Sequence, residues 1–322
     1  METDFSSSKK NTNKNKNKLG FGTWGIGGDT GPLSGYGPTD DKKSVEVLKY
    51  AFENDINFYD TAPPYGNGKS EILLKEAFHS EKIQPNILTK VGVNFWGEEP
   101  NYNPNFINSS LQKSFNRLGV DHIHCVIFHS LKSFSAKIIR EGFYHLKKLK
   151  SEKKIQKIGL SLKSPLDLLD CEDLIKEIDI IEVNLNLLDL RLLNTKLLEE
   201  IAEHKIEVIT RTPFSFGFLT NLIDENHVFL DSDHRKRWSQ EQVSSWVNGR
   251  KSLEKIFLKH GYAQPIQILA LKFCMSFDFV SHVIPGMLSI DEVNQNLKAL
   301  QVKDFPNELL NELIEHGNNF SL

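Results

Sequence analysis

Short apolar stretches alternate with amphipathic stretches along the chain from Leu19 onward. The short stretches are apolar throughout or at every second position, which predicts buried β-strands. The stretches between them repeat apolar residues every three or four positions, which predicts helices. Eight strands are predicted, at residues 19–24, 57–62, 86–92, 122–129, 157–162, 180–186, 207–213 and 282–287.

Helices are predicted in the gaps, including Lys42 to Asn54, Asn105 to Leu118, Ala136 to Ser151 and Gln264 to Phe273. Strictly alternating strands and helices form a parallel sheet, and eight repeats is the number that closes a (β/α)8 TIM barrel. An open, doubly wound sheet is the alternative, but it normally carries a GxGxxG turn after its first strand, and none follows Trp24. The α/β pattern therefore predicts a single-domain barrel over residues 19–322.

Composition narrows the possible partners. Residues 1–18 are rich in Lys and Asn and carry too little apolar surface to join a core, so a disordered tail is predicted there. With 39 Lys and Arg against 42 Asp and Glu, the net charge of -3 disfavours nucleic acid as a partner. No apolar run is long enough to cross a membrane. The 3 cysteines form no CxxC pair, which favours a reducing, cytoplasmic location. The oligomeric state is left open.

Four polar residues lie at or just after the ends of consecutive predicted strands, where barrels of this type carry their active sites. They are Asp60, Tyr65, Lys90 and His129. Alternation along the fourth strand points His129 into the barrel, and a carboxylate at the top of the second strand needs a partner, which Lys90 provides. Taken singly, each residue is more often structural; the four together indicate an active site.

The chemistry of these four residues fits carbonyl reduction. A Lys90 ammonium near Tyr65 is expected to lower the phenol pKa from about 10 towards the working pH. Tyr65 is then suited to give a proton to a carbonyl oxygen while hydride reaches the carbon, and His129 to donate a hydrogen bond to the same oxygen. Pro63 and Pro64 stiffen the link between Asp60 and Tyr65.

Eight stretches of the chain resemble the aldo-keto reductase family, in family order and with family-like spacing. They are GFGTWGIGG (20–28), FYDTAPPYGNGKSE (58–71), ILTKVG (87–92), RLGVDHIHCVIFH (117–129), IGLS (158–161), NLLDLR (186–191), RTPFSFGFLT (211–220) and IPGMLSIDEVNQN (284–296). The resemblance implies an NAD(P)H-dependent oxidoreductase that reduces an aldehyde or ketone to an alcohol and needs no metal. It implies Tyr65 as the general acid/base, Asp60 and Lys90 as residues that tune it, and His129 as the residue that positions the carbonyl.

The resemblance also implies a set of contacts to NADP(H) or NAD(H). These are Gly22, Thr23, Trp24, Asp60, Ser161, Glu182, Arg211, Thr212, Pro213, Phe214, Gly217, Leu219, Ile284, Gly286, Ser289, Glu292 and Asn296. Where the family commonly holds the nicotinamide carboxamide with Asn and Gln, this chain has Leu162 and Glu182. Glu182 can still accept a bond from the amide, whereas Leu162 cannot. Arg211 stands where relatives have an aromatic or polar residue near the nicotinamide.

The segment from Gly286 to Asn296 is implied to hold the adenosine phosphate at a helix N-terminus, which suits anions. Many NADP-preferring relatives carry basic residues where this chain has Gly286 and Glu292. A carboxylate there repels a 2′-phosphate, so tolerance of or preference for NAD is one hypothesis. Ser289 and Glu292 also form a capping-box pattern, in which Glu292 reaches back to the backbone of Ser289. The two interpretations are compatible.

Other functions remain open. GNGKS (66–70) ends like a phosphate loop, but Pro63 occupies the place of its first Gly, so Ser70 is expected to cap the next helix. A cofactor-binding regulatory subunit of the same fold, with little or no turnover, is the alternative to an enzyme. Phosphate or metal chemistry lacks a ligand cluster. Trp24, Phe95 and Trp96 suggest apolar pocket walls, but the identity of the substrate cannot be predicted.

Overall fold

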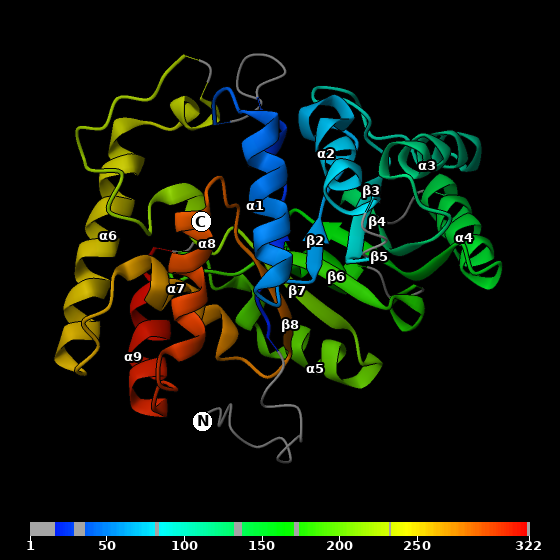
Figure 1. Ribbon diagram of the computed structural model, residues 1–322. Helices are drawn as coiled ribbons and strands as arrows, with labels where there is room; N and C mark the ends of the chain where they lie inside the picture. Colours follow the sequence, from blue (N-terminus) through cyan, green and yellow to red (C-terminus); the bar gives the residue numbers. More distant parts are fainter. Residues whose placement is uncertain are drawn as a thin grey trace.

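Eight parallel strands, hydrogen-bonded in chain order, form the centre of the protein in a computed structural model (Figure 1). The described residues are 17–28, 36–80, 84–131, 137–170, 174–231 and 233–320, so residues 1–16 of the predicted tail lie outside them. The strands are β1 (Phe21–Gly22), β2 (Phe58–Asp60), β3 (Asn86–Val91), β4 (Ile123–Leu131), β5 (Ile155–Leu162), β6 (Ile180–Asn184), β7 (Glu207–Arg211) and β8 (Val280–Ile284).

The two ends of the sheet meet and nearly close the barrel. Parallel bridges join Leu19 to Val283 and Gly22 to Gly286, and the Gly20 amide donates to the Val283 carbonyl at 2.8 Å. The predicted TIM barrel is therefore confirmed, and the open doubly wound sheet is not the fold.

Helices surround the strands, as Figure 1 shows. The described residues include α1 (Asp41–Glu53), α2 (Lys69–Phe78), α3 (Pro104–Leu118), α4 (Lys137–Ser151), α5 (Thr195–His204), α6 (Gln240–Lys259), α7 (Ile266–Met275), α8 (Ile290–Leu297) and α9 (Asn307–Asn318). The four helices predicted by range correspond to α1, α3, α4 and α7, with ends displaced by at most two residues. Three of these helices, α1, α3 and α7, carry Asp, Asn or Pro at or near their first turn, the residues that favour helix starts.

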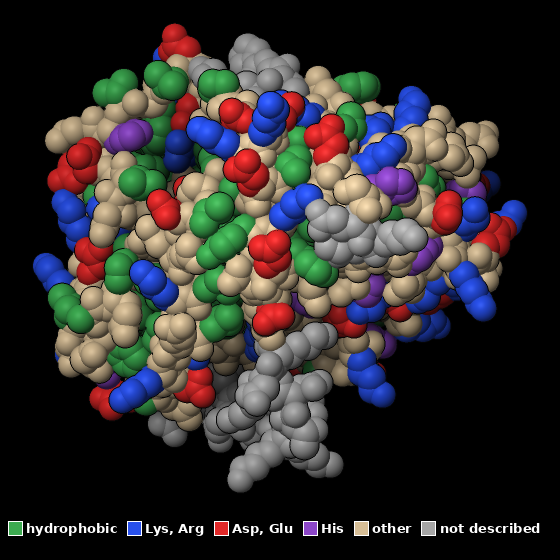
Figure 2. Space-filling model, viewed as in Figure 1, with side chains coloured by type: hydrophobic (Ala, Val, Ile, Leu, Met, Phe, Trp, Pro, Cys, Tyr) green, Lys and Arg blue, Asp and Glu red, His purple; other side chains and the backbone are tan. Residues whose placement is uncertain are grey.

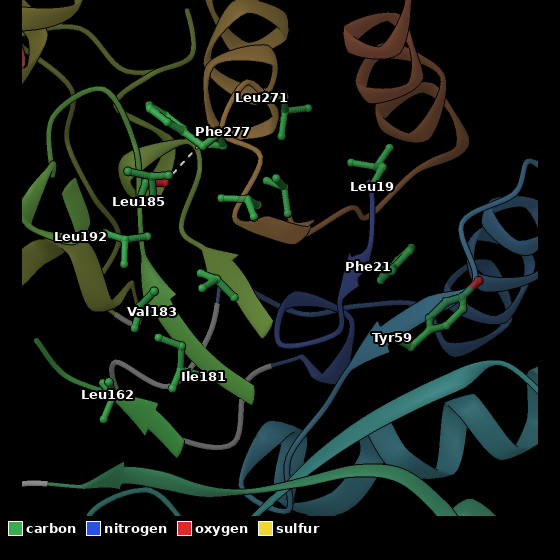
Figure 3. Packing of buried hydrophobic residues seen from close by; sticks show 14 of the residues in the cluster. Leu19, Phe21, Tyr59, Leu162, Ile181, Val183, Leu185, Leu192, Leu271 and Phe277 are labelled. Carbon is green, nitrogen blue, oxygen red and sulfur yellow. Dashed lines mark hydrogen bonds between the residues drawn. The ribbon is translucent and has the colours of Figure 1, made fainter. Parts of the chain in front are cut away.

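Two apolar layers position the site. A small cluster inside the barrel comprises Phe58, Leu88, Cys125, Ile127, Ile180, Ile209 and Ile284. A larger cluster joins the outward strand residues to the helices; in Figure 3, Phe21 and Tyr59 lie on neighbouring strands and Leu271 lies on a helix. Because side chains alternate along a strand, residues two positions beyond the inner cluster also point inward. Those residues are Asp60, Lys90, His129, Glu182 and Arg211.

The described chain begins with residues bound to the barrel. Asn17 donates to the Asp55 carbonyl, and the Lys18 ammonium donates to the carbonyls of Met275 and Phe277 at 3.0 and 2.9 Å. These last two residues of the predicted tail are thus held in place by hydrogen bonds.

Charged side chains of both signs are interspersed on the face of the molecule seen in Figure 2. Within the described ranges, no helix combines the length and apolar character required to span a bilayer.

Candidate active site

Three of the four residues that were predicted to carry the chemistry form one buried, hydrogen-bonded unit. The Lys90 ammonium forms an ion pair with Asp60 and donates to the Tyr65 hydroxyl at 3.1 Å. It also donates to the Thr61 carbonyl at 3.3 Å. An ammonium has three protons and no acceptor, so the Tyr65 oxygen accepts in this contact and its own proton stays available for another acceptor.

His129 completes the predicted group. Its ring centroid lies 6.1 Å from that of Tyr65, and its side chain is buried. The Tyr102 hydroxyl donates to the His129 carbonyl at 2.8 Å and so braces the end of β4. Burial, together with the charges of Lys90 and Arg211, holds the pKa of His129 well below its usual range. The imidazole is therefore neutral near neutral pH.

Local backbone geometry fixes where Tyr65 lies. The residue opens a short 3-10 turn, Tyr65–Gly68, in which Gly66 has φ 61°. A Cβ at Gly66 would lie 2.5 Å from the Gly27 carbonyl oxygen, so only glycine allows this close approach. Ser70 donates to the Thr23 carbonyl at 2.9 Å and makes no capping bond, because α2 starts at Lys69 with Gly68 as its N-cap. The predicted capping role of Ser70 is wrong: this hydroxyl ties α2 to the end of β1.

Burial reverses one electrostatic expectation. Desolvation raises the pKa of Tyr65, and the Lys90 charge only partly opposes this effect. The predicted lowering of the phenol pKa is therefore wrong for the site as it stands. For Lys90, burial lowers the pKa, but the carboxylates of Asp60 and Glu182 outweigh it and the net pKa is raised. Tyr65 thus holds a proton and Lys90 a positive charge at neutral pH.

Aromatic rings lie beside the Tyr65 ring. Trp96 stacks on Tyr65 with ring centroids 6.1 Å apart and meets His129 edge-on at 5.7 Å. Trp24 lies 6.3 Å from Trp96. Two of the three residues suggested as apolar walls, Trp24 and Trp96, therefore adjoin the site, whereas Phe95 is half exposed.

Leu162, Glu182 and Arg211, the residues at which this chain differs from the common family pattern, are linked to one another. Glu182 Oε2 lies 3.1 Å from Lys90 Nζ, and Oε1 accepts from the Ser161 hydroxyl at 3.3 Å and lies 3.4 Å from Arg211 Nε. Arg211 also donates to the Leu162 carbonyl at 2.8 Å. These links between the departures, and the contact of Tyr102 with His129, were missed from the sequence because each joins residues on different strands or loops.

The remaining predicted cofactor residues lie at the same end of the barrel. Gly22 and Ile284 end β1 and β8, Thr23 and Trp24 follow β1, and the other residues belong to the segments after β7 and β8, namely Thr212, Pro213, Phe214, Gly217, Leu219, Gly286, Ser289, Glu292 and Asn296. After β7, Thr212, Ser215 and Phe216 all have positive φ, an unfavourable conformation that is concentrated at functional sites.

The N-terminus of α8 shows how Glu292 is used. The Ser289 hydroxyl accepts from the Glu292 amide at 3.2 Å, which confirms the N-cap. The Glu292 carboxylate accepts from the Leu288 amide and not from that of Ser289, so this detail of the predicted capping box is wrong. A Cβ at Gly286 would meet only the Gly22 carbonyl oxygen, at 3.9 Å, so the backbone is open here.

Several buried polar atoms at this end of the barrel have no hydrogen-bond partner among the described residues. They include Thr23 Oγ1, His129 Nδ1, Glu182 Oε2 and Asn184 Oδ1. Buried polar groups normally find partners, so these atoms fit a polar ligand such as a nicotinamide cofactor. In the described part of the chain, no group of three or more His, Cys, Asp or Glu side chains is arranged to hold a metal ion.

A family model described as "Aldo/keto reductase family" matches residues 18–318. The chain belongs to this family. A probable aldo-keto reductase of Glycine max is 30% identical over 294 residues, covering 89% of this chain and 81% of that protein. An NADH-specific methylglyoxal reductase of Escherichia coli is 28% identical, covering 92% and 94%.

Solved structures of aldo-keto reductases share the fold. A glycerol dehydrogenase of Gluconobacter oxydans matches with a TM-score of 0.77 and 23% identity, covering 94% of this chain and 92% of that chain. The holo form of an aldo-keto reductase from Bacillus halodurans matches with a TM-score of 0.73 and 24% identity, covering 95% and 92%. This aldo-keto reductase is accordingly an oxidoreductase of a family whose members generally act on small carbonyl compounds with NAD(P)H.

Proposed function

We propose that this aldo-keto reductase reduces an aldehyde or ketone to an alcohol with NAD(P)H, and that Tyr65 donates the proton. The 3.1 Å contact between Lys90 and Tyr65 carries the proposal. It leaves the phenolic proton free and places a positive charge beside the oxygen that would become negative.

The proposed chemistry divides between the cofactor and the chain. A bound reduced nicotinamide supplies hydride to the carbonyl carbon. Tyr65 gives its proton to the carbonyl oxygen, which completes the alcohol, and Lys90 stabilises the phenolate that remains until it regains a proton from water. His129, neutral in this environment, donates a hydrogen bond to the same oxygen. Asp60 keeps Lys90 charged and in place.

The cofactor contacts are also proposals. Glu182 Oε2 has no hydrogen-bond partner among the described residues and can accept a bond from a carboxamide. The Glu292 carboxylate, at the start of α8, favours NADH over NADPH because it repels a 2′-phosphate. The name of the NADH-specific relative supports this preference. Titration of the protein with each reduced cofactor tests it, and tighter binding of NADPH would contradict it.

We continue to predict a cytoplasmic location, a small carbonyl or alcohol substrate and no nucleic-acid partner. The start of the barrel domain at residue 19 also stays a prediction. The alternative function is a cofactor-binding regulatory subunit. The complete buried unit of Asp60, Lys90 and Tyr65 favours the enzyme.

Replacement of the proton donor tests the proposal. Tyr65→Phe is expected to lower kcat by about 10²- to 10⁴-fold on whichever aldehyde of a panel the parent reduces, with little change in the Kd of the reduced cofactor. Tyr144→Phe is the matched control, since it removes a phenolic hydroxyl from an exposed ring on α4, outside the proposed catalytic and cofactor sites. Full activity of Tyr65→Phe would contradict the role of Tyr65, whereas tight cofactor binding by a parent with no turnover would favour the regulatory subunit.

A further inference from the structure

A second carboxylate lies against the Lys90 ammonium. The three protons of Lys90 are engaged by Asp60, the Thr61 carbonyl and Tyr65. Glu182 Oε2 lies 3.1 Å from the same nitrogen but takes part in no hydrogen bond with the described residues. Glu182 is therefore a second carboxylate partner of Lys90, in an ion pair whose charge acts on the ammonium. It approaches from β6, four strands round the barrel from Asp60 on β2.

Arg211 balances this carboxylate. Its Nε lies 3.4 Å from Glu182 Oε1, and its Nη2 is anchored on the Leu162 carbonyl at 2.8 Å. The Glu182 side chain is 2% exposed and that of Arg211 27%, so the guanidinium is the outer member of the pair. Lys90, Glu182 and Arg211 thus form a row of alternating charge across β3, β6 and β7.

This row is needed for electrical balance. Together with Asp60, the row makes a connected group of two carboxylates and two cations, and uncompensated buried charge is strongly unfavourable. Burial and the neighbouring Glu182 charge raise the pKa of Asp60. For Glu182, burial acts upward, but Lys90 and Arg211 outweigh it and lower the net pKa. Glu182 is accordingly the more firmly ionised of the two carboxylates.

We propose that Glu182 and Arg211 are positioning residues of the reaction, which act on the Tyr65 hydroxyl through the charge of Lys90. The proposal rests on the proposed function, in which Tyr65 exchanges a proton with the substrate. It differs from the expected cofactor contact of Glu182, because it concerns the acid and not the carboxamide.

The groups around Tyr65 give the expected signs. Lys90 faces it from β3, Asp60 from β2, Glu182 from β6 and the neutral His129 from β4. Burial raises the Tyr65 pKa, and the Glu182 charge raises it further. Removing that negative charge lowers the Tyr65 pKa. Removing the Arg211 charge leaves the negative charge of Glu182 less compensated, and this raises the Tyr65 pKa.

Alcohol oxidation makes these signs measurable, because the ionised form of Tyr65 must accept the alcohol proton. Glu182→Gln keeps the shape of the side chain. In this variant, kcat/KM is expected to rise at a pH about one unit lower than in the parent. In Arg211→Gln, the rise is expected about half a unit higher, since this group is partly exposed. The double variant is expected near the parent. Glu207→Gln is the matched control, because it removes one carboxylate from the Lys157–Glu207 pair. This pair lies near the N-terminal ends of β5 and β7, at the end of the barrel opposite the site.

The outcomes separate two failures. If Tyr65→Phe is inactive but the single variants at 182 and 211 keep the parent pH profile, or shift it in the same direction, the positioning role is overturned and the proposed function stands. A change in cofactor Kd without a pH shift also overturns it. If the parent shows no turnover, or Tyr65→Phe is active, both proposals fail. Should Glu182→Gln not fold, the upward shift in Arg211→Gln still decides.

Discussion

His129 is a buried histidine that stays neutral, and this has a cost for folding in acid. Its pKa is depressed in the folded protein by burial and by Lys90 and Arg211. Below about pH 6.5 the unfolded chain binds a proton at this histidine that the folded chain does not bind. The free energy of unfolding therefore falls as pH decreases, by about 1.4 kcal/mol per pH unit from this residue.

We predict that His129→Asn flattens the dependence of stability on pH by about that slope. Urea denaturation of parent and variant at a series of pH values below about 6.5 measures it. His122→Asn, at an exposed position, is the control for the substitution itself. Parallel pH profiles for parent and His129→Asn would show that the imidazole accepts a proton in the folded state.

Glu292 has a structural contact, and we propose an electrostatic role for it in cofactor choice. Its carboxylate accepts from the Leu288 amide, which an isosteric amide oxygen can also do. Glu292→Gln is therefore predicted to keep α8 intact while it strengthens NADPH binding by about three- to tenfold and leaves the Kd of NADH unchanged. Fluorescence titration with both reduced cofactors measures the two constants.

Asp291→Asn provides the comparison, since Asp291 carries the same charge in the same first turn of α8 and is exposed. An equal gain in NADPH affinity from Asp291→Asn would mean that the net charge of the helix end matters and that the position of Glu292 does not.

Among the secondary-structure elements, a buried ion pair joins α2, α3 and β3 behind the site. Glu71 is fully buried, and its carboxylate accepts from the Thr89 hydroxyl at 2.7 Å and from Arg117 Nε at 2.6 Å. Removing one partner of such a pair leaves a buried charge without compensation. We predict that Arg117→Met lowers the free energy of unfolding by about 3 kcal/mol, measured by chemical denaturation.

The matched comparison is Lys148→Met in α4, which breaks an exposed pair with Glu152 at 3.9 Å. That change should cost less than about 0.5 kcal/mol. Similar losses in the two variants would mean that the Arg117 pair contributes no more than a surface pair does.

Strand alternation explains what could be predicted. The row Cys125, Ile127, His129 fixes which residue of β4 points inward, and the same alternation places Asp60 and Lys90, so the unit could be located from the sequence. Contacts across the barrel could not. The approach of Glu182 to Lys90 depends on the register of strands far apart in the chain, and the raised pKa of Tyr65 depends on how completely its neighbours exclude water.

For the whole molecule, the contact between the first and last strands is the weakest join of the barrel. β1 has only two residues. Two isolated bridges, Leu19 to Val283 and Gly22 to Gly286, connect this part of the chain to β8 and the residues after it. Lys18 reinforces this join in two ways: its carbonyl accepts from the Val283 amide at 2.8 Å, and its ammonium donates to two carbonyls just before β8. A cation at the end of α7 also suits the helix dipole.

Lys18→Met is therefore predicted to cost about 1–2 kcal/mol of stability and to loosen the barrel locally. Hydrogen exchange measures the local effect at the amides of Gly20 and Gly22, which donate across the join to β8 and the residue after it. Their exchange should accelerate, while amides in the middle of β4 and β5 follow global stability. Lys259→Met, which breaks a surface pair with Glu312, should affect neither. If Gly20 and Gly22 keep their protection in Lys18→Met, the barrel closes without help from Lys18, through the backbone bonds of β1 alone.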